Sequence, residues 1–279
     1  MFLIGIRLAN YLCAGEGHLN RCINIRKHLD HSVVWFLDKK DKKISTLYPK
    51  DKVFIESDKT SLNKSILECK KNKINLMIVD SYAIKKKLLE KLNKKVFTSL
   101  IMDSYKKVYA NIIIIPQPLR VKKIKNITYL IGTKYAPINF IKENKSAIKD
   151  SLLVSMGMHD SKGISLKIIK ALIQNYKKKS IKLNTIITLG KKSPILKKIK
   201  EDIKKYKDKI HLKVDVKNIN LIYDKSLFAI GAPGLSHFER LASGVPSILV
   251  AQSKNHNLLV EKWNLINCCI SCKNNITSI

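Results

Sequence analysis

The stretch Gly15-Glu16-Gly17-His18-Leu19-Asn20-Arg21 comes soon after a short apolar run that contains Ile4 and Ile6. Downstream, apolar residues recur at close to helical spacing, at Leu19, Cys22, Ile23, Ile25 and Leu29. The pattern predicts a strand, a glycine turn and then a helix. Gly15 and Gly17 permit positive φ angles and close approach of a ligand to the backbone, and the N–H groups of a helix start favour an anion. His18, just past the turn, is therefore the first candidate for a reactive side chain.

Short apolar runs alternate with lysine-bearing amphipathic stretches along the whole chain, which is typical of parallel strands joined by helices. In the first half we expect strands at residues 3–6, 33–37, 53–55, 76–79, 96–101 and 112–115. In the second half we expect them at residues 151–155, 183–188, 210–214, 228–231 and 247–250. The sequence thus predicts an α/β protein with two Rossmann-like domains, at residues 1–140 and 151–279, joined by a linker at residues 141–150.

The chain carries 54 Lys and Arg residues against 21 Asp and Glu residues, a formal net charge of +33. Such a charge could attract nucleic acid or an anionic membrane surface. The lysines, however, are spread through every predicted helix and loop, and no helix-turn-helix, zinc-finger or RNA-binding motif is recognisable. We therefore attribute the charge to compositional bias and expect no nucleic-acid partner. The charge would still help to attract a nucleotide diphosphate.

The cysteines do not form the pattern of a secreted disulfide-bonded protein. Cys269 and Cys272 have C-x-x-C spacing, but a zinc site would need further ligands at a suitable distance, and there is no D-x-D metal motif. We expect buried or free thiols and no metal. No uncharged apolar stretch approaches the length of a membrane span and no signal peptide precedes the glycine motif, so the sequence predicts a cytoplasmic protein.

Neither half of the chain has the dinucleotide fingerprint G-x-G-x-x-G, because Asn20 stands where the third glycine would belong. We therefore expect no nicotinamide or flavin cofactor. In the second half, the predicted strand at residues 228–230 leads into a turn and then to Ser236, a natural N-cap residue, with Glu239 three positions later. This spacing fits a capping box, in which both residues serve only the helix, and it also fits a nucleotide site at a helix N-terminus.

The spacing from Arg7 to His18, followed by Arg21-Cys22, resembles the opening of the UDP-2,4-diacetamido-2,4,6-trideoxy-β-L-altropyranose hydrolase family of pseudaminic acid biosynthesis. Ala9 and Tyr11 replace the Asp and Ser usual in that family. Further segments resemble it in the same order along the chain: Val79–Tyr82, Asp103, Ile131–Ala136, Ser155–Asp160, Gly231–Arg240 and Gly244–Pro246. In the fourth of these segments, Met158 and His159 stand where the family has Gly and Thr. The last two segments also resemble the nucleotide-binding signature of related GT-B sugar-nucleotide enzymes.

The resemblance implies two Rossmann-like domains that face each other across a cleft, as in GT-B enzymes. It also implies metal-independent hydrolysis of a UDP-linked sugar at the anomeric carbon, which releases free sugar and UDP. His18 would be the general base, because an imidazole ordinarily titrates near neutral pH. The resemblance places ten residues at the substrate: Arg7, Gly15, Gly17, Arg21, Asp80, Tyr82, Asp103, Gly157, Ser236 and Glu239. Among these, Ser236 and nearby N–H groups would hold the diphosphate, and Glu239 would accept hydrogen bonds from the ribose.

Two alternatives stay open. The same base, leaving group and fold would serve a GT-B glycosyltransferase, in which His18 activates an acceptor hydroxyl instead of water. A nonenzymatic nucleic-acid-binding protein is supported by charge alone, and strongly salt-dependent binding of DNA or RNA would reveal it.

Overall fold

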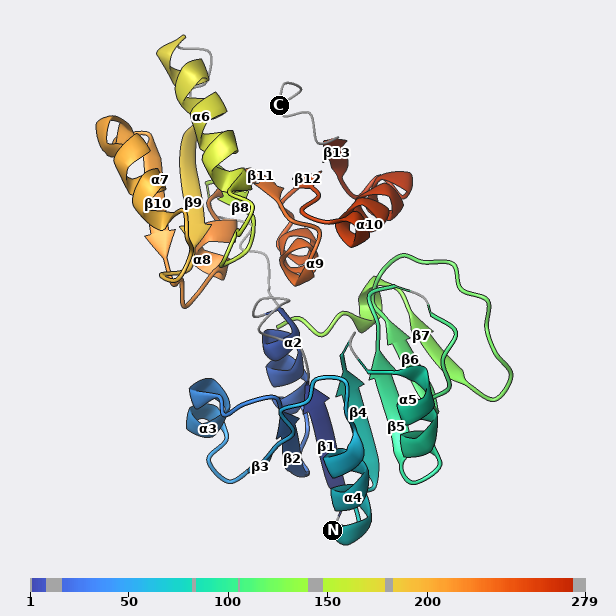
Figure 1. The fold of residues 1–279 in the computed structure, drawn as a ribbon. Coiled ribbons are helices and arrows are strands. Elements are labelled where there is room, and N and C mark those ends of the chain that lie inside the picture. Colours follow the sequence, from blue (N-terminus) through green and yellow to red (C-terminus); the bar gives the residue numbers. More distant parts are fainter. Residues whose placement is uncertain are drawn as a thin grey trace. The chain divides into compact units, whose positions relative to one another are not determined.

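The computed structural model describes residues 2–8, 17–81, 84–104, 106–139, 148–178 and 183–272, without the side chains of residues 254, 255 and 272. The chain divides into two compact units, Met1–Ile138 and Asn139–Ile279. Each unit is built on one parallel β-sheet (Figure 1). Gly15 and Tyr82, two of the predicted substrate-binding residues, lie outside the described residues, as do Ala9 and Tyr11.

The first unit contains a seven-stranded sheet in the order β3-β2-β1-β4-β5-β6-β7. Its strands are β1 (Leu3–Leu8), β2 (Ser32–Leu37), β3 (Lys52–Ile55), β4 (Leu76–Asp80), β5 (Phe97–Ile101), β6 (Ile112–Ile115) and β7 (Thr128–Ile131). Its helices are α2 (Gly17–Arg26), α3 (Lys42–Leu47), α4 (Asn63–Lys71) and α5 (Lys86–Asn93), with the 3-10 helix η1 (Thr133–Tyr135) after the last strand. The strand order reverses between β1 and β4, and open α/β sheets bind ligands at such a reversal.

Helices cover both faces around the centre of this sheet, so its central strands are apolar on both sides. On one face, Leu19 of α2 and Ile44 of α3 pack in a cluster with Ile6 of β1. On the other face, Leu89 of α5 packs in a cluster with Met77 of β4. Burial of each such side chain contributes roughly 1.5–3 kcal/mol. These two cores fix β1 and β4 beside each other, and with them the segments that follow their carboxyl ends.

The second unit contains a six-stranded sheet in the order β10-β9-β8-β11-β12-β13, again with parallel neighbours. Its strands are β8 (Ser151–Ser155), β9 (Asn184–Leu189), β10 (Ile210–Val214), β11 (Ser226–Gly231), β12 (Ser247–Val250) and β13 (Ile270–Cys272). Its helices are α6 (Ile164–Lys177), α7 (Leu196–Asp202), α8 (Asn220–Tyr223), α9 (Leu235–Ala242) and α10 (Lys254–Leu265), with the 3-10 helix η2 (Lys204–Tyr206). One core lies between β8 and the helices α6 and α7, and a second contains Tyr223 of α8 and Ala229 of β11.

The two parallel sheets with their helices confirm the predicted α/β class. The strands predicted at residues 112–115, 151–155, 210–214 and 247–250 have the observed bounds, and the other predicted strands differ by at most two residues at either end. The sequence pattern did not predict β7 or β13, which are short strands at the sheet edges. The helix α2 begins at Gly17, so His18 belongs to its first turn.

Candidate functional site

Three predicted site residues converge at the carboxyl edge of the first sheet. Asp80 is the last residue of β4, and the register aligns it with Leu8 of β1 and Ile101 of β5. The helix α2 follows β1 and carries His18 and Arg21, which lie on the same side of the helix because they are three residues apart. Asp80 is fully buried, and both His18 and Arg21 are only 6% exposed. Charged groups shielded to this degree must be paired with one another.

Asp80 lies between the imidazole and the guanidinium. Its Oδ1 atom is 2.6 Å from His18 Nδ1. Arg21 Nε donates to Asp80 Oδ2 at 2.8 Å, and Arg21 Nη2 donates to Asp80 Oδ1, so the contact is bidentate. Arg21 Nη1 donates to Oδ1 of Asp103, just beyond β5, at 2.7 Å. The structure therefore brings together His18, Arg21, Asp80 and Asp103, four of the site residues that were predicted from the sequence.

The charge on Asp80 fixes where the imidazole proton lies. Burial raises the pKa of Asp80, but the charge of Arg21 and the contact with His18 outweigh it and hold that pKa well below its usual range. An ionised carboxylate only accepts hydrogen bonds, so the 2.6 Å contact requires a proton on His18 Nδ1. In neutral His18 the lone pair is then on Nε2, which is the arrangement that a general base needs.

Cys22 lies beside this cluster and is not a nucleophile. Its Sγ atom donates to Asp80 Oδ2 at 3.6 Å, and the side chain is completely buried. Burial and the adjacent Asp80 charge raise the pKa of the Cys22 thiol well above its ordinary value. A neutral buried thiol is inert, since the thiolate is the reactive form.

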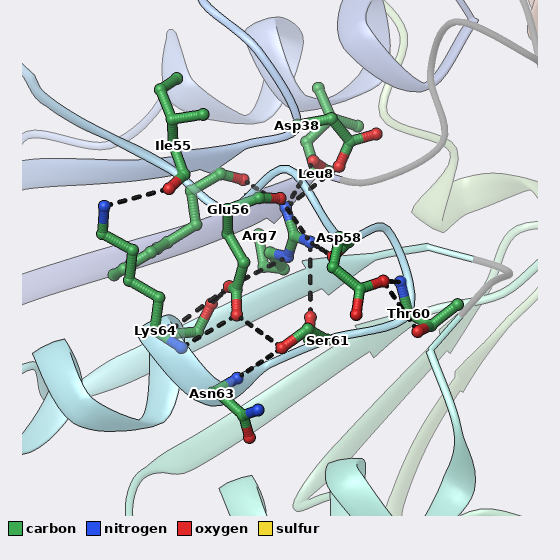
Figure 2. Close-up of polar contacts among 12 residues, drawn as sticks. Arg7, Leu8, Asp38, Ile55, Glu56, Asp58, Thr60, Ser61, Asn63 and Lys64 are labelled. Carbon is green, nitrogen blue, oxygen red and sulfur yellow. Dashed lines mark hydrogen bonds and ion pairs between the residues drawn. The ribbon is translucent and has the colours of Figure 1, made fainter.

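The guanidinium of Arg7 is held by contacts with other residues of the protein, as Figure 2 shows. It is fully buried, and its Nη2 atom donates to the carbonyl oxygens of Glu56 and Asp58 at 3.3 and 3.1 Å. Its Nη1 atom contacts Asp38 Oδ1 at 3.3 Å, and Nε lies 3.5 Å from Glu56 Oε2. These contacts tie the loop after β3 to the ends of β1 and β2. The predicted role of Arg7 in binding substrate stays a prediction, beside this role within the protein.

In the second unit, Gly157 follows β8. The two residues after it, Met158 and His159, are held in place by hydrogen bonds to their backbone carbonyl oxygens. The carbonyl oxygen of Met158 accepts from Gly190 N at 2.8 Å, and that of His159 accepts from Ser193 Oγ at 2.8 Å. Gly157 itself is exposed and has a φ of +92°, which an L side chain rarely adopts. The glycine is therefore required by the turn and leaves its backbone open to a ligand.

The N-terminus of α6 is already occupied by the protein. Asp160 accepts from the backbone N–H groups of Ile164 and Ser165 at 3.0 and 2.7 Å. Its side chain thus fills the anion position at the start of this helix. A diphosphate on this unit would have to bind elsewhere on the carboxyl edge.

The helix α9, which follows β11, corrects one prediction. Its N-cap is Gly234, and Ser236 is the second helical residue. Glu239 is then the fifth residue of the helix, so Ser236 and Glu239 do not form a capping box, in which Glu would be at the third position. An ideal Cβ on Gly234 would meet nothing within 4 Å, so the space beside this helix start is open.

Glu239 has a partner that no sequence pattern indicates. The hydroxyl group of Tyr223, from α8, donates to Glu239 Oε2 at 3.2 Å, and the Ser236 side chain also contacts that hydroxyl. Burial, together with the Glu239 charge, raises the pKa of Tyr223, so the phenol stays a donor. Burial also raises the pKa of Glu239, against the lowering effects of the Tyr223 hydrogen bond and the Arg240 charge.

Arg240 supports the loop that leads into α9. It is fully buried, and its Nη2 atom donates to Ala232 O at 2.9 Å while Nε donates to Ser247 Oγ at 2.9 Å. A Cβ on Gly231 would lie 2.8 Å from Arg240 Nη1. The glycine at the end of β11 thus leaves room for the guanidinium, which a G-x-x-x-x-S-x-x-E-R pattern alone does not reveal.

Two further observations concern the described residues as a whole. They contain no group of three or more His, Cys, Asp or Glu side chains that could hold a metal ion. No helix among them is long and apolar enough to cross a membrane.

No protein-family model matches the sequence, and no curated protein matches it significantly. Solved structures do match the fold over nearly the whole chain. MurG of Acinetobacter baumannii is 11% identical, with a TM-score of 0.64 over 100% of this chain and 87% of that chain. UGT2 of Phytolacca americana, solved with UDP-2-fluoroglucose and pterostilbene, is 11% identical, with a TM-score of 0.65 over 98% and 86%. MnaA of Staphylococcus aureus, solved with UDP, is 17% identical, with a TM-score of 0.57 over 94% and 82%. The fold is therefore of the GT-B type.

Proposed function

We propose that this protein is a UDP-sugar enzyme that hydrolyses a UDP-linked 2,4-diacetamido-2,4,6-trideoxy sugar at its anomeric carbon. The observation that carries the proposal is the 2.6 Å contact between His18 Nδ1 and an ionised Asp80 at the switch point of the first sheet. This pairing gives the base arrangement of a hydrolytic site. The resemblance of the sequence to the hydrolase family supplies the sugar, and the GT-B fold, seen in proteins solved with UDP or a UDP-sugar, supports the nucleotide.

In the proposed reaction, His18 Nε2 accepts a proton from a water molecule as the water oxygen bonds to the anomeric carbon. The bond between that carbon and the diphosphate oxygen breaks, and its electron pair leaves with UDP. Asp80 stays ionised and stabilises the imidazolium that forms, after which the proton passes to solvent. UDP is a good leaving group, so donors near the diphosphate need only stabilise its growing charge.

We assign the nucleotide to the second unit. The open start of α9 offers the N–H groups of its first turn to the diphosphate, and Ser236 lies in that turn. Glu239 would accept the ribose hydroxyl groups, with Tyr223 holding one carboxylate oxygen. The exposed backbone of Gly157 would border the same ligand.

A GT-B glycosyltransferase is the second candidate, because a glycosyltransferase of Rickettsia africae has the same fold, with a TM-score of 0.58 and 13% identity over 99% of this chain and 85% of that chain. In that function His18 would take a proton from an acceptor hydroxyl group. The geometry of the base is the same for both reactions.

The test is incubation of the protein with a panel of UDP-sugars, including the diacetamido-trideoxy sugar, in ¹⁸O-labelled water without an acceptor. The hydrolase produces free sugar that carries ¹⁸O at the anomeric position and unlabelled UDP. Label in the phosphate would show cleavage of the diphosphate instead and would overturn the proposal. Release of UDP only after an acceptor is added would establish the glycosyltransferase.

A further inference from the structure

We infer that Arg21 is a positioning residue, which orients Asp80 toward His18 so that the imidazole can act as a base. The catalytic readout of this inference rests on the proposed function, whereas its structural readout does not. Arg21 was predicted from the sequence to bind substrate, but every described contact of its guanidinium is to the protein's own side chains.

The geometry gives the guanidinium little freedom. Its Nε and Nη2 atoms hold both oxygens of Asp80, and Nη1 holds Asp103 at 2.7 Å. A bidentate contact fixes the plane of the carboxylate as well as its position. The orientation of Asp80, and through it the ring of His18, therefore depends on Arg21.

The charges give Arg21 a second role. Asp80 alone, 2.6 Å from the ring, would favour the protonated imidazolium, which cannot accept a proton. Arg21 Nη2 lies 3.1 Å from the same Nδ1 atom, so its positive charge opposes that protonation. Among the described residues, Asp103, on the far side of the guanidinium, and the neutral Cys22 thiol also face this cluster. Arg21 thus balances the carboxylate nearest to the base.

The experiment compares Arg21→Gln and Arg21→Lys with the full-length wild type. Arg26→Gln is the matched control, because Arg26 lies on the same helix and makes a similar bidentate pair with Asp51 through two 2.8 Å contacts. Long-range ¹H–¹⁵N NMR spectra, with the His18 signals assigned by their loss in His18→Asn, report the tautomer and the titration midpoint of the ring. Turnover is measured from pH 5.5 to 9, with the substrate concentration varied at each pH so that kcat and KM are obtained separately.

We expect Arg21→Gln to move the His18 titration midpoint upward by about one pH unit or more, since one unit corresponds to a tenfold change in the balance of the two forms. Its kcat should fall about tenfold or more below neutral pH and recover partly at high pH, with KM little changed. Arg21→Lys, which keeps the charge without the planar fork, should show a smaller shift of the midpoint and some disorder of the ring signals. Arg26→Gln should change neither quantity.

An unchanged midpoint in both Arg21 variants, or a change in KM alone, would overturn the inference, the second by returning Arg21 to substrate binding. If Arg21→Gln does not fold, Arg21→Lys decides through its midpoint and its pH profile. If the wild type turns over no UDP-sugar, the proposed function fails, but the NMR titration still decides the role of Arg21.

Discussion

Asp80, at the end of a strand in the first unit, and Glu239, in the helix that follows a strand in the second, are both shielded carboxylates, yet their pKa values shift in opposite directions. For Asp80, the paired charge of Arg21 outweighs burial, and the pKa falls. For Glu239, burial outweighs the hydrogen bond from Tyr223 and the charge of Arg240, and the pKa rises. The difference lies in the partner, because a direct ion pair favours the charged form far more than a hydroxyl group does.

This difference suits two different tasks. A permanently ionised Asp80 can hold the tautomer of His18 and stabilise a developing imidazolium. A carboxylate restrained by a single phenol, as in Glu239, retains acceptor capacity for a ligand. Under the proposed function, the carboxylate in the first unit thus serves acid–base chemistry and the one in the second serves recognition.

The largest expected effect is on turnover. His18→Asn removes the base and should lower kcat by about 10² to 10⁴, the usual contribution of general base catalysis, with little change in UDP affinity. Rates are measured at pH 7 with no acceptor present. His28→Asn is the control, because His28 is exposed just beyond the same helix. Turnover that survives in a folded His18→Asn protein would remove His18 from the mechanism. Asp80 would then have no catalytic role to compare with the binding role of Glu239.

The next effect is on the free energy of unfolding, when the carboxylate of Asp80 or of Glu239 is replaced by the corresponding amide. Asp80→Asn leaves buried Arg21 without its main charge partner and should lower the free energy of unfolding by about 3–5 kcal/mol. Glu239→Gln should lower it by less than about 1 kcal/mol, because the amide oxygen still accepts the Tyr223 hydrogen bond. Urea unfolding at pH 7 measures both. Asp103→Asn, at a side chain that is 21% exposed, should fall between them. Equal losses at Asp80 and Glu239 would show that the two environments do not differ as described.

Much of the fold could be predicted from sequence because buried parallel strands are continuous apolar runs. The four isoleucines of β6 are an example, with bounds that match the prediction. The strand β7 has less contrast: it is short, only partly buried and preceded by a lysine-rich segment. The three residues of β13, Ile270–Cys272, are too few to show a period. Short edge strands form because a neighbour supplies hydrogen bonds, which the sequence of the strand itself does not encode.

The candidate site was predictable only in part. Arg21 could be placed on a helix just past the glycine turn, with His18 at its start, and Asp80 could be placed at a strand end. Their mutual contacts, however, depend on the register that sets Asp80 beside Leu8. The burial of Arg7 depends on loop carbonyls far along the chain, which no local pattern indicates. The roles of the predicted residues toward a substrate stay predictions.

A smaller effect concerns acid stability in the second unit. His237 is completely buried, and burial, together with the Arg240 charge, lowers its pKa from an ordinary 6.5 to about 3. The unfolded chain therefore binds a proton at His237 that the folded chain does not, and stability is present above about pH 6.5 and falls as the pH approaches 3. Over that window we expect a loss of order a few kcal/mol, which His237→Leu should abolish. Unfolding is followed at pH 7, 5 and 4, with exposed His159→Leu as control. Parallel pH curves for wild type and His237→Leu would contradict the assignment.

The smallest effect concerns recognition by Glu239. Glu239→Gln should weaken UDP binding by about 1.5–3 kcal/mol, because a carboxylate accepts ribose hydroxyl groups through charge-assisted bonds that are roughly twice as strong as neutral ones. Tyr223→Phe removes the phenol that holds Oε2, 3.2 Å away, and should weaken binding by a smaller amount. Calorimetry with UDP and with 2′-deoxy-UDP distinguishes ribose contact from general damage. If Glu239 contacts the ribose, wild type prefers UDP and the preference shrinks in Glu239→Gln. A preference that persists unchanged in Glu239→Gln would mean that Glu239 serves Tyr223 alone, and the nucleotide site would then have to lie elsewhere on the second unit.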